Sequence, residues 1–209
     1  MNKILQSNLK VPNYNYVSPI YNLLARLVYG KKLEEVKKHH LEKLLNCSQI
    51  AIIGGGAGSE LKYLNTLKFK GCVYFYEPSN LILKAKKLKT NYKVIFINSP
   101  WDDKRIYDGV ITHFFLDQFS GPDLLNMVQS ISKSIKKAGI WVNSDFRNSS
   151  RIYHRLLLKF MYLFFRYTTG IPAENLENPD SLIQDNGFTK VKCIISKSQF
   201  LHSTLYNKL

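Results

Sequence analysis

Four glycines and one glutamate form the clearest chemical pattern in this sequence. The segment IAIIGGGAGSEL, at residues 50–61, is an apolar run followed by Gly54, Gly55, Gly56 and Gly58. A strand that ends in glycines before a helix lets the backbone approach a ligand closely. A second apolar run ends at Glu77, 19 residues after Gly58. A carboxylate at that spacing suits the two hydroxyls of a ribose, so the pattern predicts a nucleoside site.

Three further polar residues are candidates for proton transfer. His113 stands at the end of an apolar run, where it either acts as a base or only lines a cofactor pocket. Asp117 follows one turn later, and either caps the next helix or orients His113. Asp145 follows another apolar run, at the end of a strand where ligands bind in such sheets.

Elements that would position these residues alternate along the chain. Strands are predicted at 50–53, 72–76, 93–97, 108–112, 139–144, 190–196 and 198–206. Helices are predicted at 58–66, 79–88, 121–137, 151–167 and 179–186, after one or two amphipathic helices within 19–46. This alternation predicts parallel β-α-β units. Because only a residue or two around Ser196 and Lys197 separates the last two strands, those strands must form an antiparallel hairpin.

The predicted fold is therefore a three-layer Rossmann-like α/β sandwich. Its seven-stranded sheet is mostly parallel, with the last strand antiparallel. We expect one globular domain, in which residues 1–46 form a helical cap and residues 47–209 form the ligand-binding part.

Composition narrows the class of protein. The net charge is +15, from 30 basic and 15 acidic residues, but no lysine run is interleaved with stacking aromatics. We therefore interpret the charge as solvated helix surface and disfavour a nucleic-acid partner. The start of the chain lacks the apolar core of a signal peptide, and the most apolar window, 156–165, is too short to span a bilayer. Three scattered cysteines fit free thiols in the cytoplasm and predict no metal site.

The spacing of the glycines bears on which nucleoside binds. Dinucleotide-binding turns usually read G-x-G-x-x-G, whereas Gly54, Gly56 and Gly58 give G-x-G-x-G. The tighter spacing suits a ligand without a pyrophosphate.

With these features the chain resembles the class I S-adenosylmethionine-dependent methyltransferases, over roughly residues 15–205. The matching segments are the glycine motif, Glu77-Pro78-Ser79, the strand at 107–112, and the turns at 137–141 and 186–188. A narrower resemblance is to a bacterial methyltransferase-domain branch related to the quinone-biosynthesis C-methyltransferases. It depends on residues 19–21, 112–119, 143–147 and 161–170.

The family resemblance implies roles for particular positions. The glycines would pack against the methionine part and the ribose of S-adenosylmethionine, and Glu77 would take both ribose hydroxyls. The other implied cofactor contacts are Pro78, Ser99 and Pro100 around the adenine, Thr112 and His113 at the methionine end, and Tyr21 as an aromatic lid. The product would be S-adenosylhomocysteine. Two departures from the family pattern are Ile52 and Pro100, where many members have a carboxylate.

The resemblance also implies methyl transfer to a small molecule. The apolar segment 151–167 would shape a pocket for an apolar or aromatic acceptor, and its basic edges are compatible with peripheral contact with an anionic membrane. It equally fits a core helix or a dimer interface, so a monomer and a homodimer both stay open. The alternative functions are a nucleic-acid or protein methyltransferase, or a binding module without turnover.

Overall fold

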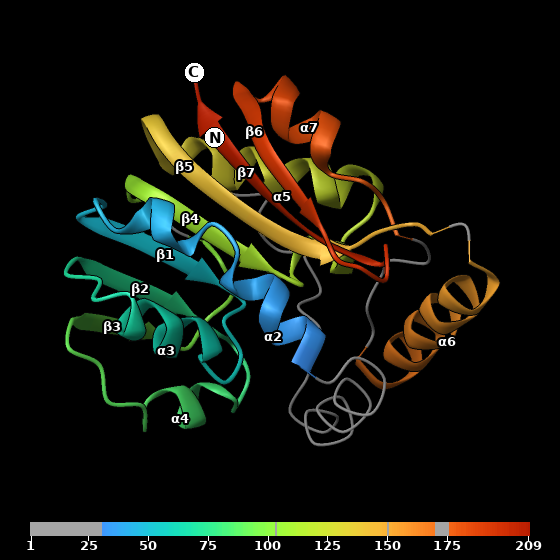
Figure 1. The fold of residues 1–209 in the computed structure, drawn as a ribbon, viewed down its shortest axis with the longest axis horizontal. Coiled ribbons are helices and arrows are strands. Elements are labelled where there is room, and N and C mark those ends of the chain that lie inside the picture. The colour runs from blue at the N-terminus through green and yellow to red at the C-terminus, as the bar shows by residue number, and fades with distance from the viewer. Residues whose placement is uncertain (1–30, 103, 150, 170–175) are drawn as a thin grey trace, which may run out of the picture.

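A computed structural model describes residues 31–102, 104–149, 151–169 and 176–209 of the chain (Figure 1). Tyr21, the predicted aromatic lid, lies outside these residues. The assignment of residues 1–46 as a separate cap stays a prediction.

One seven-stranded sheet forms the centre of the molecule. Its strands are β1 (Gln49–Ile53), β2 (Cys72–Tyr76), β3 (Lys93–Ile97), β4 (Tyr107–His113), β5 (Ile135–Phe146), β6 (Phe188–Ile195) and β7 (Leu201–Lys208). They lie in the order β3-β2-β1-β4-β5-β7-β6. The first five pair in parallel, whereas β7 is antiparallel to both β5 and β6. The predicted sheet and closing hairpin are therefore confirmed.

Helices cover both faces of this sheet (Figure 1). They are α2 (Lys31–Lys38), α3 (Ser59–Thr66), α4 (Ile82–Ala85), α5 (Gly121–Lys133), α6 (Ile152–Thr169) and α7 (Asp180–Asp185), with 3-10 turns η1 (Leu41–Leu44) and η2 (Leu116–Gln118). Apolar side chains of η1, α3 and α4 share a buried core with one face of the sheet. Those of α5 and α7 share another core with the opposite face, which gives the three layers.

Helix α6 is the exception, because it projects beyond the carboxyl end of β5 (Figure 1). It is anchored by Leu158, which is buried with Phe146 of β5 and with Phe200 beside β7. In the part of the chain that the structure describes, neither α6 nor any other helix is long and apolar enough to cross a membrane.

Two predicted helices are shorter in the structure. The helix expected at 121–137 ends at Lys133, because Ile135 already pairs with Tyr107 at the start of β4. Lys136 also contacts the Asp108 carboxylate, at 2.5 Å, so its charge is paired at the edge of the strand. The helix expected at 79–88 is regular only over Ile82–Ala85.

Candidate active site

The glycine turn after β1 is tied to the end of β2. The backbone N–H groups of Gly54 and Gly55 both donate to the Tyr76 carbonyl, at 2.9 and 3.2 Å. A Cβ at Gly55 would lie 2.3 Å from the Phe75 ring, so only glycine fits there. Gly56 has a positive φ of 55°, and a Cβ there would find only Leu81, at 3.9 Å. One side of the turn is therefore closely packed, and Gly56 adjoins open space.

Glu77 joins this turn to the next strand. One carboxylate oxygen accepts the backbone N–H of Gly56 at 2.7 Å, and the other accepts that of Ser79 at 2.8 Å. The residue is 6 % exposed. A carboxylate has about four acceptor positions, so two remain after these bonds. Glu77 is thus fixed in place and can still accept two hydroxyl groups.

The end of β3 lies beside Glu77. The Glu77 N–H donates to the Ile97 carbonyl at 3.1 Å, and the Asn98 side-chain amide donates to the Glu77 carbonyl at 2.8 Å. Ser99 and Pro100 follow directly, so they lie along the same edge of the sheet as the glycine turn. Half-buried Pro78 follows Glu77 itself. The structure thus brings these predicted adenine contacts to one edge.

A triad of Lys37, Glu60 and His113 lies at the end of β4, with the carboxylate and the imidazole buried and the Lys37 side chain 19 % exposed. Glu60, in the first turn of α3, is 1 % exposed. One of its oxygens lies 3.1 Å from the Lys37 ammonium and 3.2 Å from Nδ1 of His113. The other ring nitrogen of His113, Nε2, is buried and has no hydrogen-bond partner among the described residues. The triad therefore connects α2, α3 and β4 and leaves one nitrogen available.

The charges of the triad follow from burial and pairing. Burial would raise the pKa of Glu60, but Lys37 and the His113 hydrogen bond outweigh it and hold this pKa well below its usual range. Burial lowers the pKa of His113 by more than the contact with Glu60 raises it. Burial also opposes the charge of Lys37, yet Glu60 raises its pKa overall. At neutral pH the triad is thus a Lys37–Glu60 ion pair beside a neutral histidine.

Asp117 and Asp145 form a second polar group, on the opposite face of the sheet. The Asp117 N–H donates to one Asp145 oxygen at 3.1 Å, and the Phe146 N–H donates to the other at 2.8 Å. The Asp117 side-chain atom Oδ1 is buried without a partner among the described residues. Burial raises the pKa of both carboxyls, and the charge of Asp117 raises that of Asp145 further. Burial thus favours the protonated form of both carboxyls.

Neither alternative predicted for Asp117 is correct. Ser120 precedes α5 without any side-chain capping bond, so Asp117 does not cap that helix. His113 is oriented by Glu60, on the other face of the sheet. Asp117 instead lies in η2, where its carbonyl also accepts the Tyr162 hydroxyl of α6 at 3.0 Å.

Thr112 lies in the core. Its hydroxyl donates to the Asn143 side chain at 2.9 Å and accepts the Trp141 indole N–H at 2.8 Å. Both bonds lie within the sheet, so the hydroxyl helps to hold β4 against β5. Contact between this side chain and a cofactor stays a prediction.

Glu60 and Lys37 are the residues that sequence reasoning missed. Glu60 falls within the predicted helix 58–66 and Lys37 within the predicted amphipathic segment 19–46, and neither was predicted as a site residue. The available signal was the position of Glu60, two residues after the last motif glycine. Ile52, where many family members have a carboxylate, packs in the same core as Leu61 and Ile111.

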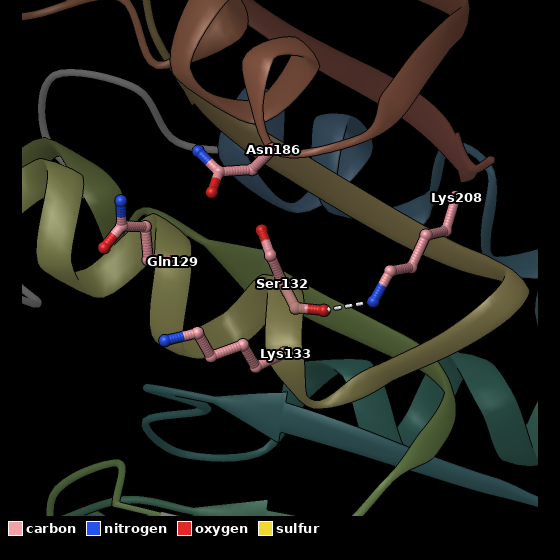
Figure 2. Close-up of a pocket in the computed structure, with 5 residues that line it drawn as sticks. All are labelled: Gln129, Ser132, Lys133, Asn186 and Lys208. Atoms are coloured by element: carbon pink, nitrogen blue, oxygen red, sulfur yellow. Dashed lines mark hydrogen bonds between the residues drawn. The ribbon is translucent and has the colours of Figure 1, made fainter.

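A hollow of about 250 Å³ lies at the other end of the sheet, between the end of α5 and the turn after α7 (Figure 2). Lys208 lines it and donates to the carbonyls of Ser132 and Ile135, at 2.6 Å each. Its charge thus compensates carbonyl oxygens where α5 ends and β5 begins. The polar lining is completed by Gln129, Lys133 and Asn186. We assign it a structural role, since it lies at the opposite strand ends from the glycine turn.

No family model and none of the curated proteins matches the sequence. Solved structures do match. Magnesium protoporphyrin IX methyltransferase from Synechocystis, solved with S-adenosylhomocysteine, has a TM-score of 0.63 at 14 % identity, covering 94 % of this chain and 96 % of its own.

Two other similar structures are longer than this chain. Human N-acetylserotonin methyltransferase, solved with S-adenosylmethionine, has a TM-score of 0.65 at 16 % identity over 93 % of this chain and 59 % of its own. An O-methyltransferase family 2 protein from Planctomyces limnophilus, solved with apigenin, has a TM-score of 0.66 at 17 % identity over 92 % and 62 %. This chain therefore has the fold of the class I S-adenosylmethionine-dependent methyltransferases.

Proposed function

We propose that the chain is a methyltransferase that uses S-adenosylmethionine and acts on a small apolar or aromatic molecule. The observation that carries the proposal is the contact between Glu77 and the glycine turn, in a sheet of the order β3-β2-β1-β4-β5-β7-β6. A narrower form of the same proposal places this chain in the bacterial branch related to the quinone-biosynthesis C-methyltransferases.

The described residues fit the nucleoside end of this methyl donor. Glu77 keeps acceptor positions for two ribose hydroxyls, and Gly56 leaves space where any side chain would intrude. The edge after β3, with Ser99 and Pro100, would hold the adenine. For the methionine end, the Lys37 ammonium and the Ser59 hydroxyl, 3.3 Å apart, are the candidate partners of a carboxylate.

The bound donor would supply a methyl group on a positively charged sulfur. The protein then has to hold the acceptor in line and exclude water, and good orientation of two reactants can contribute about 7–11 kcal/mol. The end of β4, where His113 lies, and the end of β5, where Asp145 lies, would border the reacting atoms. Both are buried, as exclusion of water requires.

The apolar character of the acceptor is supported by α6. Large side chains on one side of this helix are exposed although the helix is also anchored in a core: Ile152 66 %, Leu156 52 %, Phe160 68 %, Leu163 51 % and Tyr167 84 %. Exposed Arg155 and Lys159 adjoin them. An apolar strip with a basic border suits the surface of an anionic membrane. We propose that the acceptor is taken from such a surface.

A lipid-extract assay tests this acceptor class. Purified protein is incubated with methyl-labelled S-adenosylmethionine and a bacterial lipid extract, and the label is followed into organic and aqueous phases. Label in the organic phase supports an apolar acceptor. Label that enters only water-soluble or macromolecular products would instead indicate one of the other acceptor classes.

A further inference from the structure

The hydrogen bond between Glu60 and His113 determines which nitrogen of the histidine carries the proton. An ionised carboxylate only accepts hydrogen bonds, so Nδ1 of His113 must be the donor in the 3.2 Å contact. In a neutral imidazole the other nitrogen then carries a lone pair. Nε2 is therefore an acceptor, buried and without a partner among the described residues. Leaving a buried acceptor unpaired is unfavourable, so the site suits a ligand that donates a hydrogen bond.

The position of His113 connects this acceptor with the glycine turn. Ile53 pairs with Thr112, so His113 continues β4 beside Gly54. The connection after β4 also packs on the turn, since a Cβ at Gly54 would lie 2.7 Å from Phe115. Glu60 is two residues beyond Gly58, on α3. The turn predicted to hold the methyl donor thus adjoins both members of the Glu60–His113 pair, since it leads into Glu60 along the chain and lies beside His113 across the sheet.

We propose that Glu60 is a positioning residue that fixes His113 with its Nε2 lone pair free, so that His113 takes a proton from the acceptor. The inference rests on the proposed function and narrows its substrate class. The acceptor would carry a hydroxyl or an N–H group that loses its proton as it is methylated.

The proposed step balances without any further reactant. The acceptor O–H or N–H bond breaks, its proton moves to Nε2, and its electron pair forms the new bond to the methyl carbon. The electron pair of the broken carbon–sulfur bond stays on sulfur, which leaves S-adenosylhomocysteine. The imidazolium is stabilised by the Glu60 carboxylate and releases its proton to water after the product departs.

Charged groups around His113 make the assignment testable. Glu60 on α3 and Glu34 on α2 raise the pKa of His113, whereas burial and Lys37 on α2 lower it. Replacing Glu60 and replacing Lys37 should therefore move the His113 titration in opposite directions. Opposite shifts would show that both charged groups act on the His113 ring, as the proposed arrangement requires.

Nuclear magnetic resonance of the full chain with nitrogen-15-labelled histidine gives the direct readout. The His113 signals are assigned with a His113→Gln variant. We expect an unprotonated Nε2 and a protonated Nδ1 at neutral pH. The His113 midpoint should be lower with S-adenosylmethionine than with S-adenosylhomocysteine, because only the former places a positive charge near the ring.

Two results would overturn the inference. One is a proton on Nε2 in the neutral ring, and the other is an identical His113 midpoint with both sulfur nucleosides bound. If neither nucleoside binds, the proposed function itself fails, and calorimetry on the same sample distinguishes that outcome.

Variants provide the matched controls. Glu60→Gln should lower the midpoint of the His113 titration, and Lys37→Met should raise it. Glu60→Asp keeps a carboxylate as acceptor, so it should retain the wild-type tautomer of His113. Each single change removes one member of the Lys37–Glu60 ion pair and leaves the other charge unpaired. The double variant Lys37→Met/Glu60→Gln removes both charges, so the net charge of the protein stays the same. Lys136→Met, at the other end of the sheet, should leave the His113 signals unchanged. Shifts of the same sign in both single variants would contradict the proposed arrangement.

Discussion

The backbone N–H of Gly56 donates a hydrogen bond of 2.7 Å to the carboxylate of Glu77. The turn after β1 and the end of β2 therefore hold each other in place before any ligand arrives. The same carboxylate is the proposed partner of the ribose, so binding energy need not be spent on ordering it.

The first prediction concerns Glu77. Glu77→Gln should weaken binding of S-adenosylhomocysteine by about 1.5–3 kcal/mol, because a hydrogen bond to a charged group is lost. Adenosine and 2′,3′-dideoxyadenosine provide the control on the ligand side. The wild-type protein should prefer adenosine, and the variant should lose most of that preference. Equal preference in both proteins would show that the ribose binds elsewhere.

A second prediction separates backbone strain from ligand contact. Gly56 and Gly121 both have positive φ values, 55° and 52°, and neither has a close neighbour at the place of a Cβ. Each Gly→Ala change should therefore destabilise the fold by a similar amount, about 1–2 kcal/mol. Only Gly56→Ala should also weaken S-adenosylhomocysteine binding in calorimetry. Equal binding by the two variants would remove Gly56 from the proposed site.

Asp117 and Asp145 predict a pH dependence of stability. Their carboxyls have a raised pKa in the folded protein, above the ordinary value of 3.8, so the folded state keeps a proton that the unfolded chain loses. Stability from this pair is therefore fully present below about pH 4 and falls as the pH rises through the folded pKa.

Urea unfolding at pH 4.5 and 7.5 measures this effect. Asp145→Asn replaces a buried acid with a neutral side chain that does not titrate. The free energy of unfolding should therefore fall less in the variant than in the wild type from pH 4.5 to pH 7.5, by about 1 kcal/mol or more. Asp185→Asn, at an exposed site, is the control and should show no such gain. A pH-independent difference between Asp145→Asn and the wild type would mean that the pair is already ionised.

The exposed apolar side chains of α6 should contribute to membrane binding and contribute little to folding stability. Phe160 is 68 % exposed, so Phe160→Ser should change the free energy of unfolding by less than about 0.5 kcal/mol. It should nevertheless reduce sedimentation with vesicles that contain anionic lipid. Leu83→Ser, on α4 and 55 % exposed, is the matched control and should sediment like the wild type. Unaltered sedimentation of the Phe160 variant would argue against a membrane role for α6.

Periodicity predicted the sheet well because its strands are short apolar runs between turns. The closing hairpin followed from the brief separation between the last two runs. The boundary at Lys133 was missed, because Lys136 and Lys137 fit an exposed helix as well as a strand edge. Their strand conformation depends on pairing with β4, and local sequence does not encode that pairing.

The candidate site was predicted in part for a similar reason. Glu77 and the glycines have a fixed spacing along the chain, and the structure brings them together. The partner of His113 is 53 residues away along the chain, at Glu60, and no spacing rule connects them. Contacts of this kind arise from the way in which α3 packs on β4. Asp117 was likewise assigned to neighbours in sequence, whereas its partner Asp145 comes from the next strand.

Calorimetry of the purified full chain with S-adenosylmethionine, S-adenosylhomocysteine and NAD tests the central claim most directly. We expect saturable binding of both sulfur nucleosides at one site, weakened in Glu77→Gln, and no binding of NAD. Binding of NAD without binding of either sulfur nucleoside would contradict it.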